Sequence, residues 1–158
     1  KILRERGLSG QFVLDFYGAT LPEYDFPSLA LDLGVQDSVT FYPFICDIGA
    51  VYRTADTLIL PSRGEGLSNT LLEAMSSGLA VIASRVSGTQ DVVDDSLDGI
   101  LIPPDSPVSL ADQMERVMTN PELALKLGQN ARQKIEASFS LGVIARRYSQ
   151  LYESLNKL

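Results

Sequence analysis

The sequence predicts an α/β fold in which a parallel sheet is covered by helices on both faces. Three observations lead to this prediction. Short apolar runs rich in β-branched and aromatic residues recur in the first part of the chain, helical patterns lie between them, and the end of the chain is helical. Alternation of apolar strands with helices is typical of parallel sheets, because each crossover helix covers one face of the sheet.

The expected strands are short, and four of the five end at glycine or proline. Gly18 closes the first strand, and Pro43 and Pro61 close two others, because proline has no N–H group to give to a strand ladder. The expected strands are Gln11–Tyr17, Val39–Tyr42, Thr57–Leu60, Ala80–Ala83 and Gly99–Ile102.

Helical patterns lie between these strands and fill the end of the chain. Ser106 followed by Pro107 marks a helix start, because serine caps a helix and proline fits its first turn. Gly78 marks a helix end. The apolar stripe with Tyr148 and Tyr152 predicts a last helix packed on the core. The expected helices are Pro22–Leu33, Asp47–Thr54, Ser68–Ser77, Thr89–Val93, one that starts at Pro107, Pro121–Ala137 and Leu141–Leu155.

Length and composition fit one globular domain and argue against some partners. The chain has 158 residues, of which 45% are hydrophobic and 21% charged, and its net charge is −7. This acidic balance argues against electrostatic binding to nucleic acid or to an anionic membrane. No apolar run approaches the ~20 residues that span a bilayer. We therefore expect no nucleic-acid partner and no transmembrane segment.

The residue inventory narrows the chemistry and the compartment. The chain has no histidine, which excludes imidazole bases and histidine metal ligands within it. Cys46 is the single cysteine, so we expect a packing role for it and a reducing, cytoplasmic setting for the protein. Because Lys1–Gly7 reads as the end of a helix, we also expect the chain to be a piece of a longer protein.

The segment Pro61–Met75 joins the end of a strand to the start of a helix. Ligands of parallel α/β sheets bind at the carboxyl ends of the strands, which places this turn at the functional edge. With Ser68 as the N-cap, the N–H groups of Ser68, Asn69 and Thr70 have no partner within the helix. Together with the helix dipole they form an anion site, for which a diphosphate is a natural occupant.

Two glutamates flank this anion site. Glu65 lies between Gly64 and Gly66, which let the backbone approach a ligand closely. Glu73 lies near the first turn of the helix, and a carboxylate that accepts two hydrogen bonds suits a vicinal diol such as a ribose. A glutamate there is also common as a surface charge that complements the helix dipole. The residues themselves therefore predict a nucleotide-type ligand and leave the reaction open.

The spacing of the two glutamates resembles the signature of a known enzyme family. Glu65-x7-Glu73, within Pro-Ser-x-x-Glu-Gly-Leu-Ser-Asn-x-Leu-Leu-Glu-Ala-Met, resembles the E-x7-E motif of the retaining GT-B-type glycosyltransferases (family 4-like, group 1). Val39–Phe44 is similar to the V-x-F-x-G strand of that family, with proline in place of glycine, and Ser87–Asp91 is similar to its G-G-x-x-E segment. The resemblance implies a Rossmann-like, C-terminal donor-binding domain, one half of a GT-B fold, over residues 1–158.

The resemblance also implies a role for each matching residue. Glu65 matches the acid that contacts the donor hexose near the reacting centre, and Glu73 matches the acid that binds the ribose. The other implied contacts are Gly66, Leu67 and Ser68 to the sugar, Asn69 and Thr70 to the diphosphate, and Phe44, Ile45 and Asp47 to the nucleobase.

By the same resemblance, the partners are a nucleotide-diphosphate sugar and an N-terminal acceptor domain that this chain lacks. The family's first strand, with an arginine and a lysine that neutralise the diphosphate, would precede Lys1, so the chain alone is not expected to transfer sugar. The family works without a bound metal or other cofactor and retains stereochemistry. Members often act on lipid-linked or polysaccharide acceptors, and any peripheral membrane association would fall to the missing domain.

Two other functions stay open on the sequence. One is a non-catalytic nucleotide-binding α/β module, and the other is a nucleotide-sugar epimerase on the same fold. These residues do not specify the nucleobase, the donor sugar or the acceptor.

Overall fold

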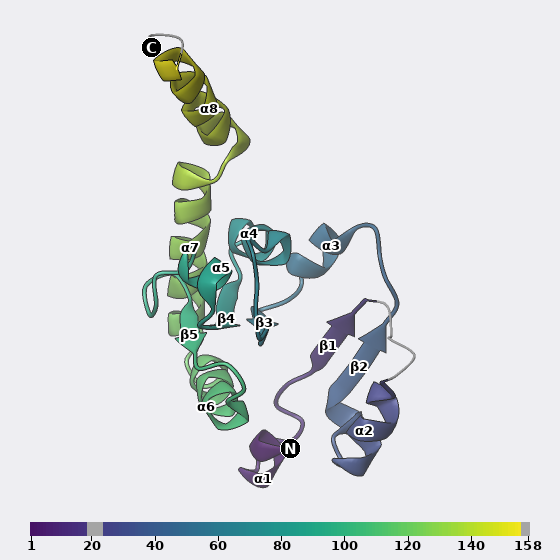
Figure 1. Cartoon of the computed structure of the whole chain (residues 1–158). Helices are drawn as coiled ribbons and strands as arrows, with labels where there is room; N and C mark the ends of the chain where they lie inside the picture. The colour runs from purple at the N-terminus through teal and green to yellow at the C-terminus, as the bar shows by residue number, and fades with distance from the viewer. Residues whose placement is uncertain (19–23, 156–158) are drawn as a thin grey trace. The chain divides into compact units, whose positions relative to one another are not determined.

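The computed structural model describes residues 1–18 and 24–155 of the chain, so the first residues of the expected helix Pro22–Leu33 lie outside the described part. The chain divides into two compact units, Lys1–Ala50 and Val51–Leu158. Hydrogen bonds join the strands into two parallel sheets, a pair in the first unit and a three-stranded sheet in the second (Figure 1). The predicted α/β fold with parallel strands is confirmed.

The first unit is built on β1 (Leu14–Tyr17) and β2 (Val39–Tyr42), which run parallel. Phe16 and Phe41 are opposite each other in the register, and their rings stack with centroids 5.2 Å apart. The other elements of this unit are α1 (Ile2–Glu5), α2 (Phe26–Asp32) and the 3₁₀ turn η1 (Gln36–Ser38).

Two boundaries in this unit differ from the prediction. The strand expected over Gln11–Tyr17 starts only at Leu14, because Leu14 is the first residue that pairs with a residue of β2. The next helix starts at Phe26, because the Asp25 carboxylate accepts the N–H group of Ser28 at 3.0 Å and so caps it.

The second unit contains the sheet β3 (Thr57–Leu60), β4 (Ala80–Ser84) and β5 (Ile100–Ile102), in that spatial order. The central strand β4 is buried along its whole length. Its side chains alternate between two apolar clusters, as the two-residue period of a strand requires. Val81 belongs to one cluster and Ile82 to the other. The sheet therefore has a core on each face.

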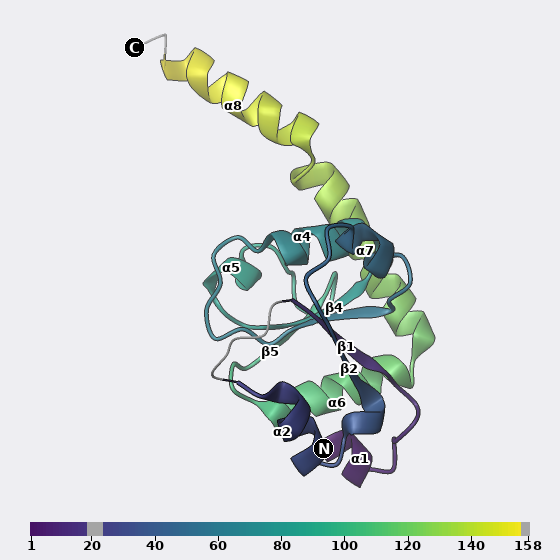
Figure 2. The ribbon, with the colours of Figure 1, turned by 90° about the vertical axis from the view of Figure 1, so that its right-hand side faces the viewer.

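Helices supply the other side of both cores. Figure 2 shows α4 and α6 on opposite sides of the strands of this unit. Residues of α4 join the cluster that includes Val81, and residues of α6 join the cluster that includes Ile82. The helices that follow β3 are α4 (Asn69–Ser76), α5 (Ser87–Gln90), α6 (Pro107–Met118), α7 (Pro121–Ser138) and α8 (Leu141–Leu155), while α3 (Ile48–Tyr52) lies across the boundary of the two units. The short helix expected over Thr89–Val93 starts two positions earlier, at Ser87.

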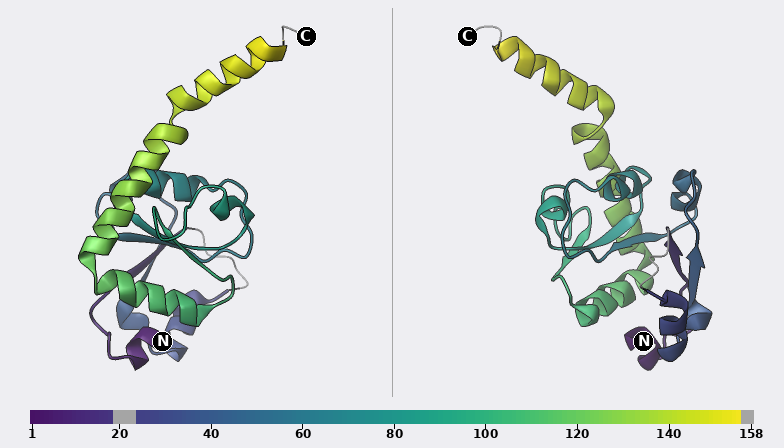
Figure 3. Two further views of the ribbon diagram at one scale, coloured as in Figure 1. Left: turned by 90° about the vertical axis from the view of Figure 1, so that its left-hand side faces the viewer. Right: turned by 45° about the vertical axis from the view of Figure 1, so that its right-hand side comes forward.

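Two expected packing roles are wrong. In α8, Tyr148 and Tyr152 are 58% and 63% exposed, because this helix continues beyond α7, away from the strands of its unit (Figure 3). Cys46 is exposed, in the segment between β2 and α3. Among the described residues, no helix combines the length and the apolar character needed to cross a bilayer.

Candidate functional site

The loop over residues 61–68 connects the end of β3 to the start of α4. Ser68 caps α4 as predicted: its backbone is extended and its hydroxyl accepts the N–H group of Leu71 at 3.4 Å. An α-helix offers no internal acceptor for its first N–H groups, so those of Asn69 and Thr70 are available to a ligand. With the positive end of the helix dipole, they can bind an anion.

Glu65 lies in this loop and is partly exposed. The Ser62 hydroxyl donates a hydrogen bond to its Oε1 at 2.6 Å. This bond holds the carboxylate near the end of β3 while the rest of the carboxylate stays free to accept further bonds.

Glu73 lies in α4, one turn beyond the helix start, and is exposed. The phenol O–H of the buried Tyr52 donates a hydrogen bond to Glu73 Oε2 at 3.4 Å. Burial, and then the negative charge of Glu73, raise the pKa of Tyr52 above its ordinary value of 10.0. The phenol therefore keeps its proton at neutral pH and remains a donor to the carboxylate.

The loop is also held from outside itself. The N–H group of Gly88, in α5, donates to the backbone oxygen of Glu65 at 3.2 Å. On the exposed side, Arg63 Nε forms an ion pair with Asp105 Oδ1 at 2.7 Å. These contacts join the loop after β3 to the segments that follow β4 and β5, because parallel strands bring their carboxyl ends to one edge.

The second unit thus brings together the predicted residues of one loop and one helix start: Glu65, Gly66, Leu67, Ser68, Asn69, Thr70 and Glu73. The predicted nucleobase residues lie in the first unit, between β2 and α3. Phe44 is 74% exposed, Ile45 is partly buried, and the Asp47 carboxylate accepts the N–H group of Ala50 at 3.2 Å. Asp47 therefore caps α3.

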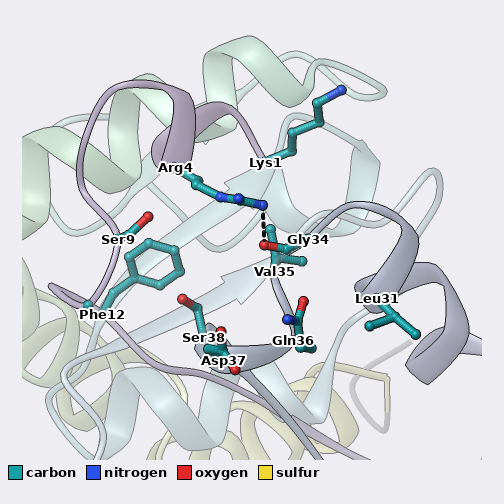
Figure 4. Close-up of a pocket in the computed structure, with 11 residues that line it drawn as sticks. Lys1, Arg4, Ser9, Phe12, Leu31, Gly34, Val35, Gln36, Asp37 and Ser38 are labelled. Carbon is teal, nitrogen blue, oxygen red and sulfur yellow. Dashed lines mark hydrogen bonds between the residues drawn. The ribbon is translucent and has the colours of Figure 1, made fainter.

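A pocket of about 360 Å³ lies in the first unit (Figure 4). Arg4 donates a hydrogen bond from Nη1 to the backbone oxygen of Gly34 in its wall. Ser9, Gly10 and Phe12 in its lining precede β1, and residues 36–38 precede β2, so the pocket lies at the amino ends of these strands. Ligands of parallel α/β sheets bind at the opposite edge, and the pocket holds none of the predicted site residues.

No group of three or more potential metal-ligating side chains that could hold an ion occurs within residues 1–18 and 24–155. The polar groups of the candidate site are carboxylates, hydroxyls and helix N–H groups. This set can bind a polyol together with an anion.

A profile of the family described as "Glycosyl transferases group 1" matches residues 1–134. The chain belongs to this family. Group 1 glycosyltransferases of solved structure that resemble it have the GT-B fold.

Relatives and solved structures agree with this assignment. The chain is 30% identical over 155 residues to the alpha-D-kanosaminyltransferase of Streptomyces kanamyceticus, with 97% of this chain and 40% of that protein covered. Sucrose-phosphate synthase from Thermosynechococcus elongatus superposes with a TM-score of 0.85 at 29% identity, over 99% of this chain and 41% of that chain. Anabaena HepE, in complex with UDP, has the same fold, with a TM-score of 0.86 at 22% identity over 94% of this chain and 42% of that chain. This group 1 chain therefore spans about 40% of the length of the proteins it matches.

The sequence patterns did not identify some of the residues that hold the two glutamates of the candidate site in place. Tyr52 is 21 positions away from Glu73, so their bond depends on the packing of α3 against α4. A signal existed, because a buried tyrosine normally finds a partner for its hydroxyl. Ser62 and Gly88 both lie in motifs singled out above, but their contacts with Glu65 follow only from the fold.

Proposed function

We propose that this chain is the C-terminal donor-binding domain of a retaining glycosyltransferase, and that it binds a nucleoside-diphosphate sugar at the turn between β3 and α4. The observation that carries the proposal is the arrangement of this turn. A capped helix start offers free N–H groups, and a glutamate lies on either side of it, Glu65 in the loop and Glu73 in the helix. Family membership supports it.

In this proposal, each part of the turn binds one part of the donor. The N–H groups of Asn69 and Thr70 hold the diphosphate, Glu73 accepts the ribose hydroxyls, and Glu65 accepts hydroxyls of the sugar near its reacting carbon. The backbone of Gly66, Leu67 and Ser68 contacts the same sugar. Phe44, Ile45 and Asp47 are assigned to the nucleobase.

The chemistry follows from the charge that develops during transfer. The bond between the anomeric carbon and the diphosphate oxygen breaks, and the oxygen of the acceptor hydroxyl bonds to that carbon on the same face, which retains its configuration. The proton of the acceptor hydroxyl passes to a base that the proposal places outside these residues. The leaving diphosphate gains negative charge, which the helix N–H groups stabilise because they are already oriented toward it. The proposal requires no metal ion, because the helix start and cationic residues outside this chain supply the positive charge.

Structural relatives support the nucleotide part of the proposal. HepE has been solved in complex with UDP and with UDP-glucose, and shares this fold. Among the curated relatives, one name specifies a kanosaminyl group and another specifies a glycosyltransferase of D-inositol 3-phosphate, so the sugar donor of this chain is a question for the titrations below.

Isothermal titration calorimetry tests the proposal. UDP, GDP and ADP, and then the corresponding glucose conjugates, are titrated into the chain. One nucleotide is expected to bind, and its sugar conjugate to bind at the same site in competition with it. Absence of binding by all of these ligands would contradict the proposal.

A further inference from the structure

Gly88 lies directly against the loop that carries Glu65. Gly88 is buried at the start of α5, and its N–H group donates to the backbone oxygen of Glu65 at 3.2 Å. A Cβ atom on Gly88 would lie 1.7 Å from the backbone oxygen of Gly66 and 2.7 Å from that of Glu65. Carbon and oxygen atoms that are not bonded do not approach so closely, and both obstacles are main chain. Only glycine permits this contact.

The requirement for glycine here comes from space alone. The backbone of Gly88 does not have the positive φ angle that favours glycine. The contrast with the loop itself is direct, since a Cβ on Gly64 or on Gly66 would meet nothing within 4 Å. Space for a side chain is therefore lacking at Gly88 in α5 and not at the two glycines of the loop.

The helix start that holds the loop is itself firmly anchored. Thr89 is fully buried, and its hydroxyl accepts the N–H group of Val86 at 3.1 Å and donates to the backbone oxygen of Ser84 at the end of β4. Val92 and Val93, just after α5, belong to the apolar core. A side chain added to Gly88 would therefore displace the loop more readily than the helix.

We propose that Gly88 is a positioning residue, whose bare backbone seats the Glu65–Gly66 peptide and thereby fixes where the Glu65 carboxylate lies. Ser62 holds the side chain of Glu65, and Gly88 holds its main chain. The consequence for sugar binding rests on the proposed function, in which Glu65 contacts the sugar. The seat itself does not depend on any ligand.

The first test is amide hydrogen exchange on the full chain without ligand. In Gly88→Ala, the peptides that cover residues 61–68 are expected to exchange at least tenfold faster than in the wild type. Gly64→Ala is the matched control within the loop and should leave this exchange unchanged. Gly128→Ala is the matched control for a clash, because a Cβ there would lie 2.0 Å from the backbone oxygen of Gly78, in another part of the unit. It should destabilise the chain without a selective effect on residues 61–68.

A ligand readout separates positioning from general destabilisation. With UDP and UDP-glucose as probes, Gly88→Ala is expected to weaken UDP-glucose binding at least tenfold and UDP binding less than threefold, because the diphosphate is held by α4 and not by the loop. Equal losses for the two probes would overturn the inference, as would unchanged exchange in residues 61–68. If the wild type binds neither probe while the exchange result holds, the seat stands and UDP-glucose is not the donor.

If Gly88→Ala does not fold, a second variant tests the proposal. Ser62→Ala removes the hydrogen bond on the other side of Glu65 and should loosen the loop. Because the Gly88 N–H group donates a hydrogen bond to Glu65, the hydrogen exchange of the Gly88 amide is then expected to rise severalfold. Unchanged exchange at Gly88 in a folded Ser62→Ala variant would contradict the proposed seat.

Discussion

The phenol of Tyr52 donates a hydrogen bond to the carboxylate of Glu73 across 3.4 Å. Tyr52 is 6% exposed while Glu73 lies at the surface, so a fixed donor holds an exposed acceptor. The pair links the end of α3 to α4 and orients the carboxylate that we assign to the ribose.

Tyr52→Phe should weaken nucleotide binding and leave the fold intact. The change keeps the ring in place and removes one hydrogen bond, which is worth about 1 kcal/mol, or roughly a fivefold loss of affinity. Titration calorimetry with the nucleotide that binds the wild type measures the loss. Tyr148→Phe, on the exposed face of α8, is the control and should bind as the wild type does. Unchanged affinity in Tyr52→Phe would show that Glu73 needs no such orientation.

The two glutamates should have separable effects. Glu73→Ala is expected to weaken binding of the free nucleoside diphosphate by about 2–3 kcal/mol, because a charged contact to the ribose is lost. Glu65→Ala should leave that binding nearly unchanged and reduce turnover strongly in the intact enzyme, because Glu65 is assigned to the sugar.

The control for both changes is Glu122→Ala. Glu122 lies in the first turn of another helix, α7, outside the site, and its loss should leave nucleotide affinity unchanged. Equal losses of nucleotide affinity in Glu65→Ala and Glu73→Ala would contradict the division of roles.

Lys134 should contribute to stability in a pH-dependent way. Its Nζ lies 3.0 Å from Oδ2 of Asp98, whose side chain is 3% exposed, and 2.8 Å from Oδ2 of Asp94. Burial alone would lower the pKa of Lys134, but the two carboxylates raise it above the ordinary 10.5. Lys134→Met leaves a buried carboxylate without its cation and should lower the free energy of unfolding by about 2–3 kcal/mol at pH 7.

The sign of the pH dependence follows from the direction of this shift. Because the folded pKa of Lys134 lies above the unfolded value, its contribution is complete below pH 10.5 and is lost as the pH rises through the folded pKa. Urea unfolding of wild type and variant should therefore differ at pH 7 and converge at strongly alkaline pH. Arg132→Met, which removes an exposed pair with Glu136 on the same helix, should cost less than about 1 kcal/mol. A difference that grows with pH would contradict the assignment.

The chain by itself should bind donor without transferring sugar. In the proposed enzyme, the acceptor site and the cationic partners of the diphosphate lie outside these residues. Release of UDP from UDP-glucose, measured with the isolated chain, is expected to stay at the uncatalysed level. Normal turnover by the isolated chain would refute this prediction and the domain assignment together.

Local rules predicted the starts of α4, α6 and α7. Ser68, Ser106 and Asn120 each accept the N–H group of the third residue that follows, so α4, α6 and α7 begin where their caps and prolines indicate. A helix cap and the proline beside it act within one turn of the chain, so they can be recognised from the sequence alone. The strands β2 and β3 also match their predicted bounds, because a proline directly follows each of them.

Features that depend on packing between elements were not predictable in the same way. The start of β1 depends on where β2 offers a partner, and the exposed stripe of α8 depends on what lies beside it. In the candidate site, the positions of Glu65 and Glu73 follow from the turn, while their supports, Gly88 and Tyr52, come from segments distant in sequence. The motif identified the acids but not what orients them.

The separate anchoring of the two glutamates has an evolutionary consequence. Glu65 depends on Ser62 and on the segment after β4, whereas Glu73 depends on α4 and on Tyr52. A lineage can therefore remodel the scaffold around one carboxylate and inherit the other unaltered. In the proposed donor site, substitutions around Glu65 would then alter the contacts with the sugar and leave the ribose contact of Glu73 intact.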